Sequence, residues 1–197
     1  MTVTTLDPLG IALFIIAAFV IAGSIHSAWL ASPVSRRLQI PVDGRLHIRG
    51  RRLFGDNKTV RGFIVMPPAA GFAFWSLGLL LEAISPSLRY SLWPLSSGDL
   101  ALLGTWAGLG FMLGELPNSF VKRQLDIPPG RPANGKLSSR LSFAVDRVDS
   151  IFGVMIAISI VTPMPWMTWV YVILIGPAVH LCFSVLLFGL GVKARRA

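Results

Sequence analysis

Two carboxylates spaced three positions apart are the clearest candidates for chemistry in this sequence. Asp146 and Asp149 lie in the segment SFAVDRVDSIFG, directly before an uncharged run from Ser150 to Val192. On a helix this spacing places both side chains on one face, about 5–6 Å apart between Cβ atoms. Such a pair suits Mg²⁺, which takes one or two carboxylates together with waters and substrate phosphates. The alternative is an acidic first helical turn favoured by the helix dipole, with Arg147 as an interface anchor.

A second polar stretch, GELPNSFVKRQLDIPPG, covers Gly114 to Gly130. We expect the preceding helix to end at Pro117. Glu115 lies near that end, where a carboxylate needs a partner, and it is a candidate to join the two aspartates as a metal ligand. Lys122 and Arg123 offer donors for a phosphate, or they only mark the cytoplasmic side of the membrane.

The third stretch, RLFGDNKTVRGF, precedes another apolar segment. Its Gly-Asp-Asn sequence predicts a tight turn. Lys58, Thr59 and Arg61 then place donors at the start of a helix, where free backbone N–H groups also favour a phosphate. The stretch lacks the Walker A pattern. Its alternative interpretation is a basic turn that holds lipid headgroups.

These three stretches are separated by apolar segments long enough to cross a membrane. The chain of 197 residues is 53% hydrophobic and only 14% charged, whereas soluble domains carry about 25% charged residues. A hydrocarbon core of roughly 30 Å needs about 20 helical residues. The predicted spans are Leu9–Leu30, Gly62–Leu81, Asp99–Leu116, a fourth that begins near Leu141 and ends near Thr162, and Trp166–Leu190. We therefore expect an all-α polytopic membrane protein with about five transmembrane helices, in a single domain over residues 1–197.

The distribution of charge predicts the orientation. Five spans leave seventeen of the 18 basic residues on one side, with only Arg89 on the other. The positive-inside rule makes that side cytoplasmic, with the N-terminus outside and the C-terminus inside. The net charge of +9 thus reflects topology, and no nucleic-acid partner is expected. Cytoplasmic loops at about 31–61 and 117–141 would form the active site of an integral protein of the cytoplasmic (inner) membrane. Trp93, Trp166 and Trp169 would lie at the outer interface.

The few soft metal ligands do not predict a zinc site. Cys182 is the sole cysteine, and His26, His47 and His180 are scattered, without zinc-ligand spacing. His26 and His180 lie inside predicted spans, where an imidazole is more often a packed, hydrogen-bonded residue than a ligand.

The polar stretches also resemble a known family. SFVKR followed by DRVD resembles the signature of the CTP:phosphatidate cytidylyltransferase superfamily. FGDNKTVRGF together with GELPNSFVKRQLDIPPG is similar to its short, five-span CDP-archaeol synthase branch. The Lys-Asp pair and His-Gly-Gly of the longer bacterial enzymes are absent. Glu115 stands where the archaeal branch usually has Asp.

The resemblance implies Mg²⁺-dependent transfer of CMP from CTP to a lipid phosphate, with release of pyrophosphate. It implies that Asp146 and Asp149 bind the metal, with Glu115 as a further candidate, and that Lys122 joins the two aspartates as a catalytic residue. The residues assigned to nucleotide or substrate phosphates are Asn57, Lys58, Thr59, Arg61, Ser119, Arg123 and Arg147.

The lipid phosphate would enter from the inner leaflet and be either archaetidic-acid-like, with ether links, or phosphatidic-acid-like, with ester links. The sequence leaves that choice and the oligomeric state open. The alternative is a non-catalytic lipid-binding or transport protein. Transporters place polar groups near the bilayer midplane, whereas the charges here gather at one boundary. A CDP-alcohol phosphotransferase is disfavoured because its Asp-rich helix motif is missing.

Overall fold

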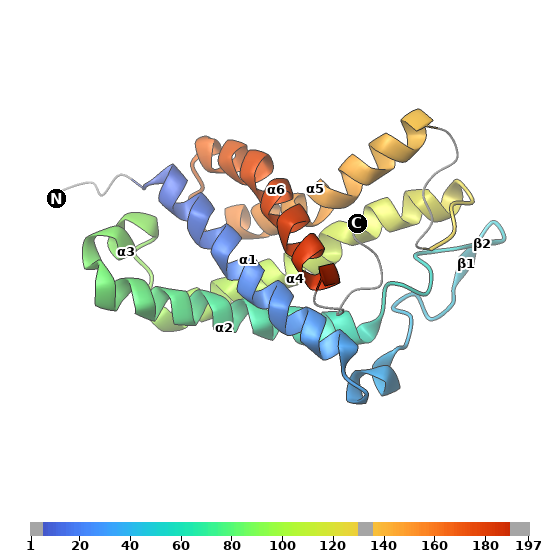
Figure 1. The fold of residues 1–197 in the computed structure, drawn as a ribbon, viewed down its shortest axis with the longest axis horizontal. Helices are drawn as coiled ribbons and strands as arrows, with labels where there is room; N and C mark the ends of the chain where they lie inside the picture. The colour runs from blue at the N-terminus through green and yellow to red at the C-terminus, as the bar shows by residue number, and fades with distance from the viewer. Residues whose placement is uncertain (1–5, 130–135, 190–197) are drawn as a thin grey trace.

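The computed structural model describes residues 6–129 and 136–189, and these residues are mostly helical (Figure 1). The helices are α1 (Pro8–Ala31), α2 (Val60–Ile84), α3 (Pro86–Leu92), α4 (Ser97–Gln124), α5 (Lys136–Val161) and α6 (Trp166–Gly189), with a 3-10 turn η1 (Val34–Leu38). Strands β1 (His47–Ile48) and β2 (Arg51–Arg52) form one antiparallel hairpin in the loop between α1 and α2.

Five long helices lie at the five predicted positions. Within the described ranges, three of them are long and apolar enough to cross a membrane, namely α1, α2 and α4. Helix α5 begins at Lys136 rather than near Leu141, so its first turns are polar. The described part of α6 contains a shorter apolar stretch, Trp166–Val179. An integral membrane protein made of helices is confirmed, while the count of five spans and their orientation stay predictions.

The predicted stop at Pro117 is wrong. Helix α4 continues through Pro117 to Gln124, so residues 117–124 of the predicted loop are helical. Proline also lies inside α2, at Pro67 and Pro68. Membrane helices tolerate proline because neighbouring helices and local adjustments satisfy the freed backbone groups. The continuation matters for function because it carries the side chains after Pro117 on the same rigid helix as Glu115.

Close packing of small residues fixes α4 between α2 and α5. A Cβ atom added at Gly108 would lie 2.7 Å from the Cα of Pro67, and one added at Gly110 would lie 2.5 Å from the carbonyl oxygen of Gly153. Small residues let the backbones of membrane helices approach this closely. Helices α2 and α5 therefore both lie directly against α4.

The loop before α2 is organised around a buried carboxylate. The Asp43 side chain is fully buried and accepts hydrogen bonds from Arg52 (2.9 Å) and from the backbone N–H groups of Phe54 and Gly55 (both 3.0 Å). Burial alone would raise the pKa of Asp43, but these hydrogen bonds outweigh it and hold the pKa well below its usual range. Gly55 takes φ +89°, a backbone conformation that glycine adopts without strain. The hydrogen bonds to Asp43 thus fix the backbone of the loop at Phe54 and Gly55, shortly before Lys58.

Arg89, the one basic residue predicted on the outer side, is buried at the end of the molecule that carries α3, opposite the hairpin (Figure 1). Arg89 is 2% exposed and donates to the carbonyl oxygens of Trp93 and Leu95. Trp93 is also buried, and its indole N–H donates to the carbonyl of Pro163 at 3.1 Å. The Trp93 ring thus packs into the core, edge-on to Phe14, and its position at the outer membrane interface stays a prediction. Trp166, by contrast, is exposed.

Candidate active site

Helices α4 and α5 bring the two predicted aspartates to a shared partner. The side-chain amide of Asn118 on α4 donates to Asp146 Oδ1 at 2.6 Å and to Asp149 Oδ2 at 2.7 Å. Asp146 and Asp149 therefore turn toward the same point, as their spacing on one helix face predicts. Lys122, one helical turn beyond Asn118, forms an ion pair with Asp146.

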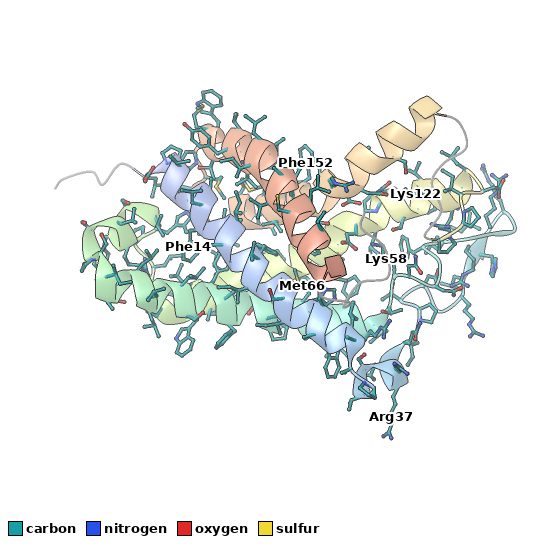
Figure 2. The ribbon with its side chains drawn as sticks, in the orientation of Figure 1. Phe14, Arg37, Lys58, Met66, Lys122 and Phe152 are labelled. Carbon is teal, nitrogen blue, oxygen red and sulfur yellow. The ribbon has the colours of Figure 1, made fainter. Side chains whose placement is uncertain are left out.

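A second ion pair lies beside this group. Lys58 lies directly before Thr59, the N-cap residue of α2. It forms an ion pair with Glu115 on α4. Ser150 on α5 joins the two sets, since its hydroxyl lies 3.1 Å from Glu115 Oε1 and 3.1 Å from Asp149 Oδ1. Figure 2 shows Lys58 and Lys122 toward the end of the molecule that carries the hairpin, whereas Phe14, near the start of α1, lies toward the end that carries α3. We call Lys58, Glu115, Asn118, Lys122, Asp146, Asp149 and Ser150 the polar cluster.

The polar cluster fits a hard cation held by two carboxylates. Among the residues that the structure describes, no three His, Cys, Asp or Glu side chains are close enough to hold a metal ion. The Asn118 amide nevertheless reaches one oxygen of each aspartate, so a single group placed there contacts both carboxylates. Mg²⁺ is commonly bound by one or two carboxylates and completes its shell with water and phosphate oxygens. Glu115 accepts hydrogen bonds from Lys58 and Ser150 in this arrangement. The assignment of Asp146, Asp149 and Glu115 as metal ligands stays a prediction.

The predicted phosphate-binding residues divide into two groups. The Arg61 guanidinium, in the first turn of α2, lies 3.4 Å from the hydroxyl of Ser35. Its Nε atom is buried and has no hydrogen-bond partner among the residues that the structure describes. Arg147 lines the apolar cavity described below together with Asp146. These two lie near the polar cluster.

A third predicted phosphate-binding residue, Lys58, belongs to the polar cluster itself. The remaining ones, Arg123, Asn57, Thr59 and Ser119, do not. Arg123 points away from the aspartates, donates to the carbonyl of Ile127 and lies against Gly55. It lines a small hollow of about 280 Å³ together with Arg51 and Arg52. Asn57 is exposed on the loop surface. Thr59 and Ser119 are buried, with 6% and 8% of their surfaces exposed.

A cavity of about 420 Å³ opens from the polar cluster along the helices. Its residues on α1 run from Ile15 to Ala31, about 24 Å at helical rise. Its wall is mostly apolar, and it includes Phe19, Met66 and Val172. Glu115, Asp146, Arg147 and Ser150 line the same cavity, so one continuous space joins an apolar wall to the carboxylates.

Two members of the polar cluster were missed by sequence reasoning, Asn118 and Ser150. Glu115, Asn118 and Lys122 lie at positions i, i+3 and i+7, which share one face of a continuous helix. That signal was hidden because the helix was expected to end at Pro117. Ser150 follows Asp149 directly, and nothing in its sequence position distinguishes it from an ordinary helical serine.

Comparisons with known proteins agree with this geometry. A family model described as CarS-like CDP-archaeol synthase matches residues 38–196. The chain is 38% identical over 142 residues to the CDP-archaeol synthase of Thermococcus onnurineus, which covers 68% of this chain and 76% of that protein. It is 32% identical over 155 residues to the one of Thermofilum pendens, covering 78% of this chain and 64% of the relative's length.

A solved structure described as an intramembrane enzyme for archaeal membrane lipids biosynthesis has the same fold. It superposes with a TM-score of 0.57 at 27% sequence identity, over 85% of this chain and 90% of that chain. The match to the family model covers most of the chain, and curated relatives exceed 30% identity over most of their own length. The chain therefore belongs to the CDP-archaeol synthase family of membrane enzymes.

Proposed function

We propose that this protein transfers CMP from CTP to the phosphate of a membrane lipid, giving a CDP-lipid and pyrophosphate, with Mg²⁺ as cofactor. The observation that carries this proposal is the continuity of the site. Asp146, Arg147 and Ser150 line the same cavity as a wall of apolar side chains from α1, α5 and α6. Such a space suits a lipid whose chains stay in the membrane while its phosphate meets a water-soluble nucleotide.

In the proposed reaction an oxygen of the lipid phosphate attacks the α-phosphorus of CTP. A bond forms between that oxygen and the α-phosphorus, and the bond from the α-phosphorus to the bridging oxygen of the β-phosphate breaks, so that pyrophosphate leaves. An ionised phosphate is already a nucleophile, so no general base is required. The protein contributes mainly by positioning both substrates and neutralising charge.

Named side chains have distinct tasks in this scheme. Asp146 and Asp149 would hold Mg²⁺, which neutralises charge on the phosphate oxygens when bound. Lys122, now paired with Asp146, would contact the nucleotide phosphates. Arg147 lines the cavity and would contact the lipid phosphate, with Lys58 beside it. The active site would face the cytoplasm at the inner membrane, as the distribution of basic residues predicts.

A direct assay tests the proposal. Purified protein in detergent is incubated with CTP, Mg²⁺ and either an ether-linked or an ester-linked glycerol lipid phosphate, and pyrophosphate and CDP-lipid are measured together. Equimolar formation of the two products supports the proposal. Absence of both products with every lipid phosphate would leave the non-catalytic lipid-binding protein as the better interpretation.

Filling the cavity tests its assignment to the lipid. Val20 lines the cavity on α1, whereas Leu13 on the same helix is 50% exposed outside it. Val20→Trp should raise the KM for the lipid phosphate and leave the KM for CTP unchanged, because the larger side chain takes space only from the hydrocarbon chains of the lipid. Leu13→Trp is the matched control and should change neither KM. Equal KM values for lipid in Val20→Trp and wild type would contradict the assignment.

A further inference from the structure

The imidazole of His26 is a polar group that the proposed reaction does not use. His26 lies on α1 and lines the apolar cavity. Its Nε2 atom is buried and has no hydrogen-bond partner in the described part of the chain, so the hydrogen bond expected for a packed intramembrane histidine is not formed there. A buried polar atom without a partner costs free energy. Such an atom facing a ligand cavity indicates that the ligand supplies the partner.

The depth of His26 places it at a boundary. From His26 toward the N-terminus of α1, the side chains that line the cavity are the apolar ones of Ile15, Ile16, Phe19 and Val20. His26 and Ser27 are the first polar residues of α1 to line the cavity. They lie about one and a half turns before the helix ends at Ala31. Leu30 and Ala31, which follow on α1, are apolar again, and the other polar residues of the cavity wall are Glu115, Asp146, Arg147 and Ser150 on α4 and α5.

The surroundings of the imidazole point to the headgroup side. Nε2 lies 3.5 Å from the position that a Cβ on Gly62 would occupy, in the first turn of α2. The charges of Glu115, Arg61 and Lys58 are near enough to act on the ring. His26 therefore lies between the cationic side chains that would bind the lipid phosphate and the apolar wall that would bind its chains.

We propose that His26 is a lipid-binding residue that donates a hydrogen bond from Nε2–H to a linkage oxygen on the glycerol unit of the lipid phosphate. This inference rests on the proposed function, since it assigns a residue that recognises the glycerol unit of the lipid substrate. In a glycerol lipid the linkage oxygens lie between phosphate and chains, which is the level of His26. Both ether and ester lipids carry such an oxygen, and an ester adds a carbonyl acceptor.

The experiment measures binding without CTP or Mg²⁺. The shift in unfolding temperature of the full chain in detergent is recorded against the concentration of three probes. A ligand that binds only the folded state stabilises it by RT ln(1 + L/Kd), where L is the concentration of free ligand, so the concentration dependence of the shift reports the affinity. The probes are a short-chain diester glycerol phosphate, its diether analogue and an alkyl phosphate of equal chain length. The variants are His26→Leu, which removes the donor, and His26→Gln, which keeps an N–H near the position of Nε2.

The inference predicts a selective loss. His26→Leu should weaken binding of the glycerol phosphates about three- to tenfold, the effect of one neutral hydrogen bond, and leave alkyl phosphate binding unchanged. His26→Gln should restore most of the affinity. A larger loss for the diester would identify the carbonyl as the acceptor, and equal losses would identify the oxygen that both lipids share. Ser24→Ala is the matched control, because Ser24 is exposed on the same turn and its hydroxyl donates to the backbone carbonyl of Val20 in α1.

Two results would overturn the inference. Equal weakening of all three probes in His26→Leu would indicate a structural role, and unchanged binding of the glycerol phosphates would show that His26 does not contact them. Because this assay needs no turnover, its outcome is separate from that of CMP transfer. A protein that makes CDP-lipid with unchanged binding in His26→Leu would refute only the role of His26.

Discussion

Gly110 on α4 and Gly153 on α5 meet backbone to backbone. A Cβ atom added at Gly110 would lie 2.5 Å from the carbonyl oxygen of Gly153, and one added at Gly114 would lie 2.6 Å from the carbonyl oxygen of Asp149. The contact therefore runs directly into the active site. Asn118 follows Gly114 by one turn, and its short side chain spans the remaining gap to both aspartates. The crossing of two helices thus sets the geometry of the candidate metal site.

Gly153→Ala should separate the two helices. The added methyl group meets rigid backbone rather than a flexible side chain, so we expect a loss of about 1–3 kcal/mol in unfolding free energy together with reduced CMP transfer. Thermal unfolding in detergent and turnover are measured on the same sample. Gly189→Ala in α6 is the control, since its Cβ would meet nothing within 4 Å and alanine is favoured in helices by up to about 1 kcal/mol. Unchanged stability and activity in Gly153→Ala would refute the close crossing.

Asn118→Leu should cost activity with little change in fold. The substitution preserves size but removes the only side chain that bonds both aspartates in the described ranges. The two carboxylates then repel and lose their common orientation, and we expect kcat/KM to fall by about tenfold or more, the cost of one charge-assisted hydrogen bond. Val121→Ala, on an exposed position of the same helix, is the control and should retain full activity. Wild-type kcat/KM in Asn118→Leu would show that the amide has no positioning role.

The Lys58–Glu115 pair should be energetically coupled. Both side chains are mostly buried, with 19% and 23% of their surfaces exposed. Lys58→Met and Glu115→Gln should each destabilise the protein, and the double variant should be less destabilised than the sum, by about 0.5–3 kcal/mol. The exposed pair Arg51–Asp126 serves as the control cycle, where a coupling below about 1 kcal/mol is expected. Additive effects at Lys58 and Glu115 would mean that the ion pair does not join the loop before α2 to α4.

Asp43 should make the loop tolerant of mild acid. Because its pKa is lower in the folded state than the reference value of 3.8, the stability that it contributes is fully present above about pH 4. That stability is lost only as the pH falls further toward the folded-state pKa. Asp43→Asn should remove this contribution at neutral pH, at a cost of roughly 3 kcal/mol, since Arg52 is left without its buried partner.

Limited proteolysis of the loop between α1 and α2, compared at pH 7 and pH 4.5, checks this prediction. The wild-type loop should resist cleavage at both values, and the Asp43→Asn loop should be cleaved at both. Protection of the wild-type loop that disappears between pH 7 and pH 4.5 would contradict a depressed pKa for Asp43.

The sequence predicted the helices better than it predicted their contacts. Five long apolar segments are a direct consequence of the bilayer thickness, and each corresponds to a helix. The spacing of Asp146 and Asp149 placed them on one face because helical periodicity is local. Pro117 was misinterpreted because the rule for soluble helices was applied to a chain that folds in lipid, and this error hid Asn118. The partners of Glu115 and the burial of Trp93 depend on tertiary packing, which no local pattern specifies.

The most direct test of the central claim is CMP transfer by Asp146→Asn and Asp149→Asn beside the wild type. The account predicts that the wild type forms CDP-lipid and pyrophosphate in equal amounts. It also predicts that each variant loses about a hundredfold or more in turnover, because several kcal/mol of charge stabilisation disappear, while the unfolding temperature changes little. Near-normal transfer by both folded variants would contradict the assignment of these two carboxylates as the catalytic centre.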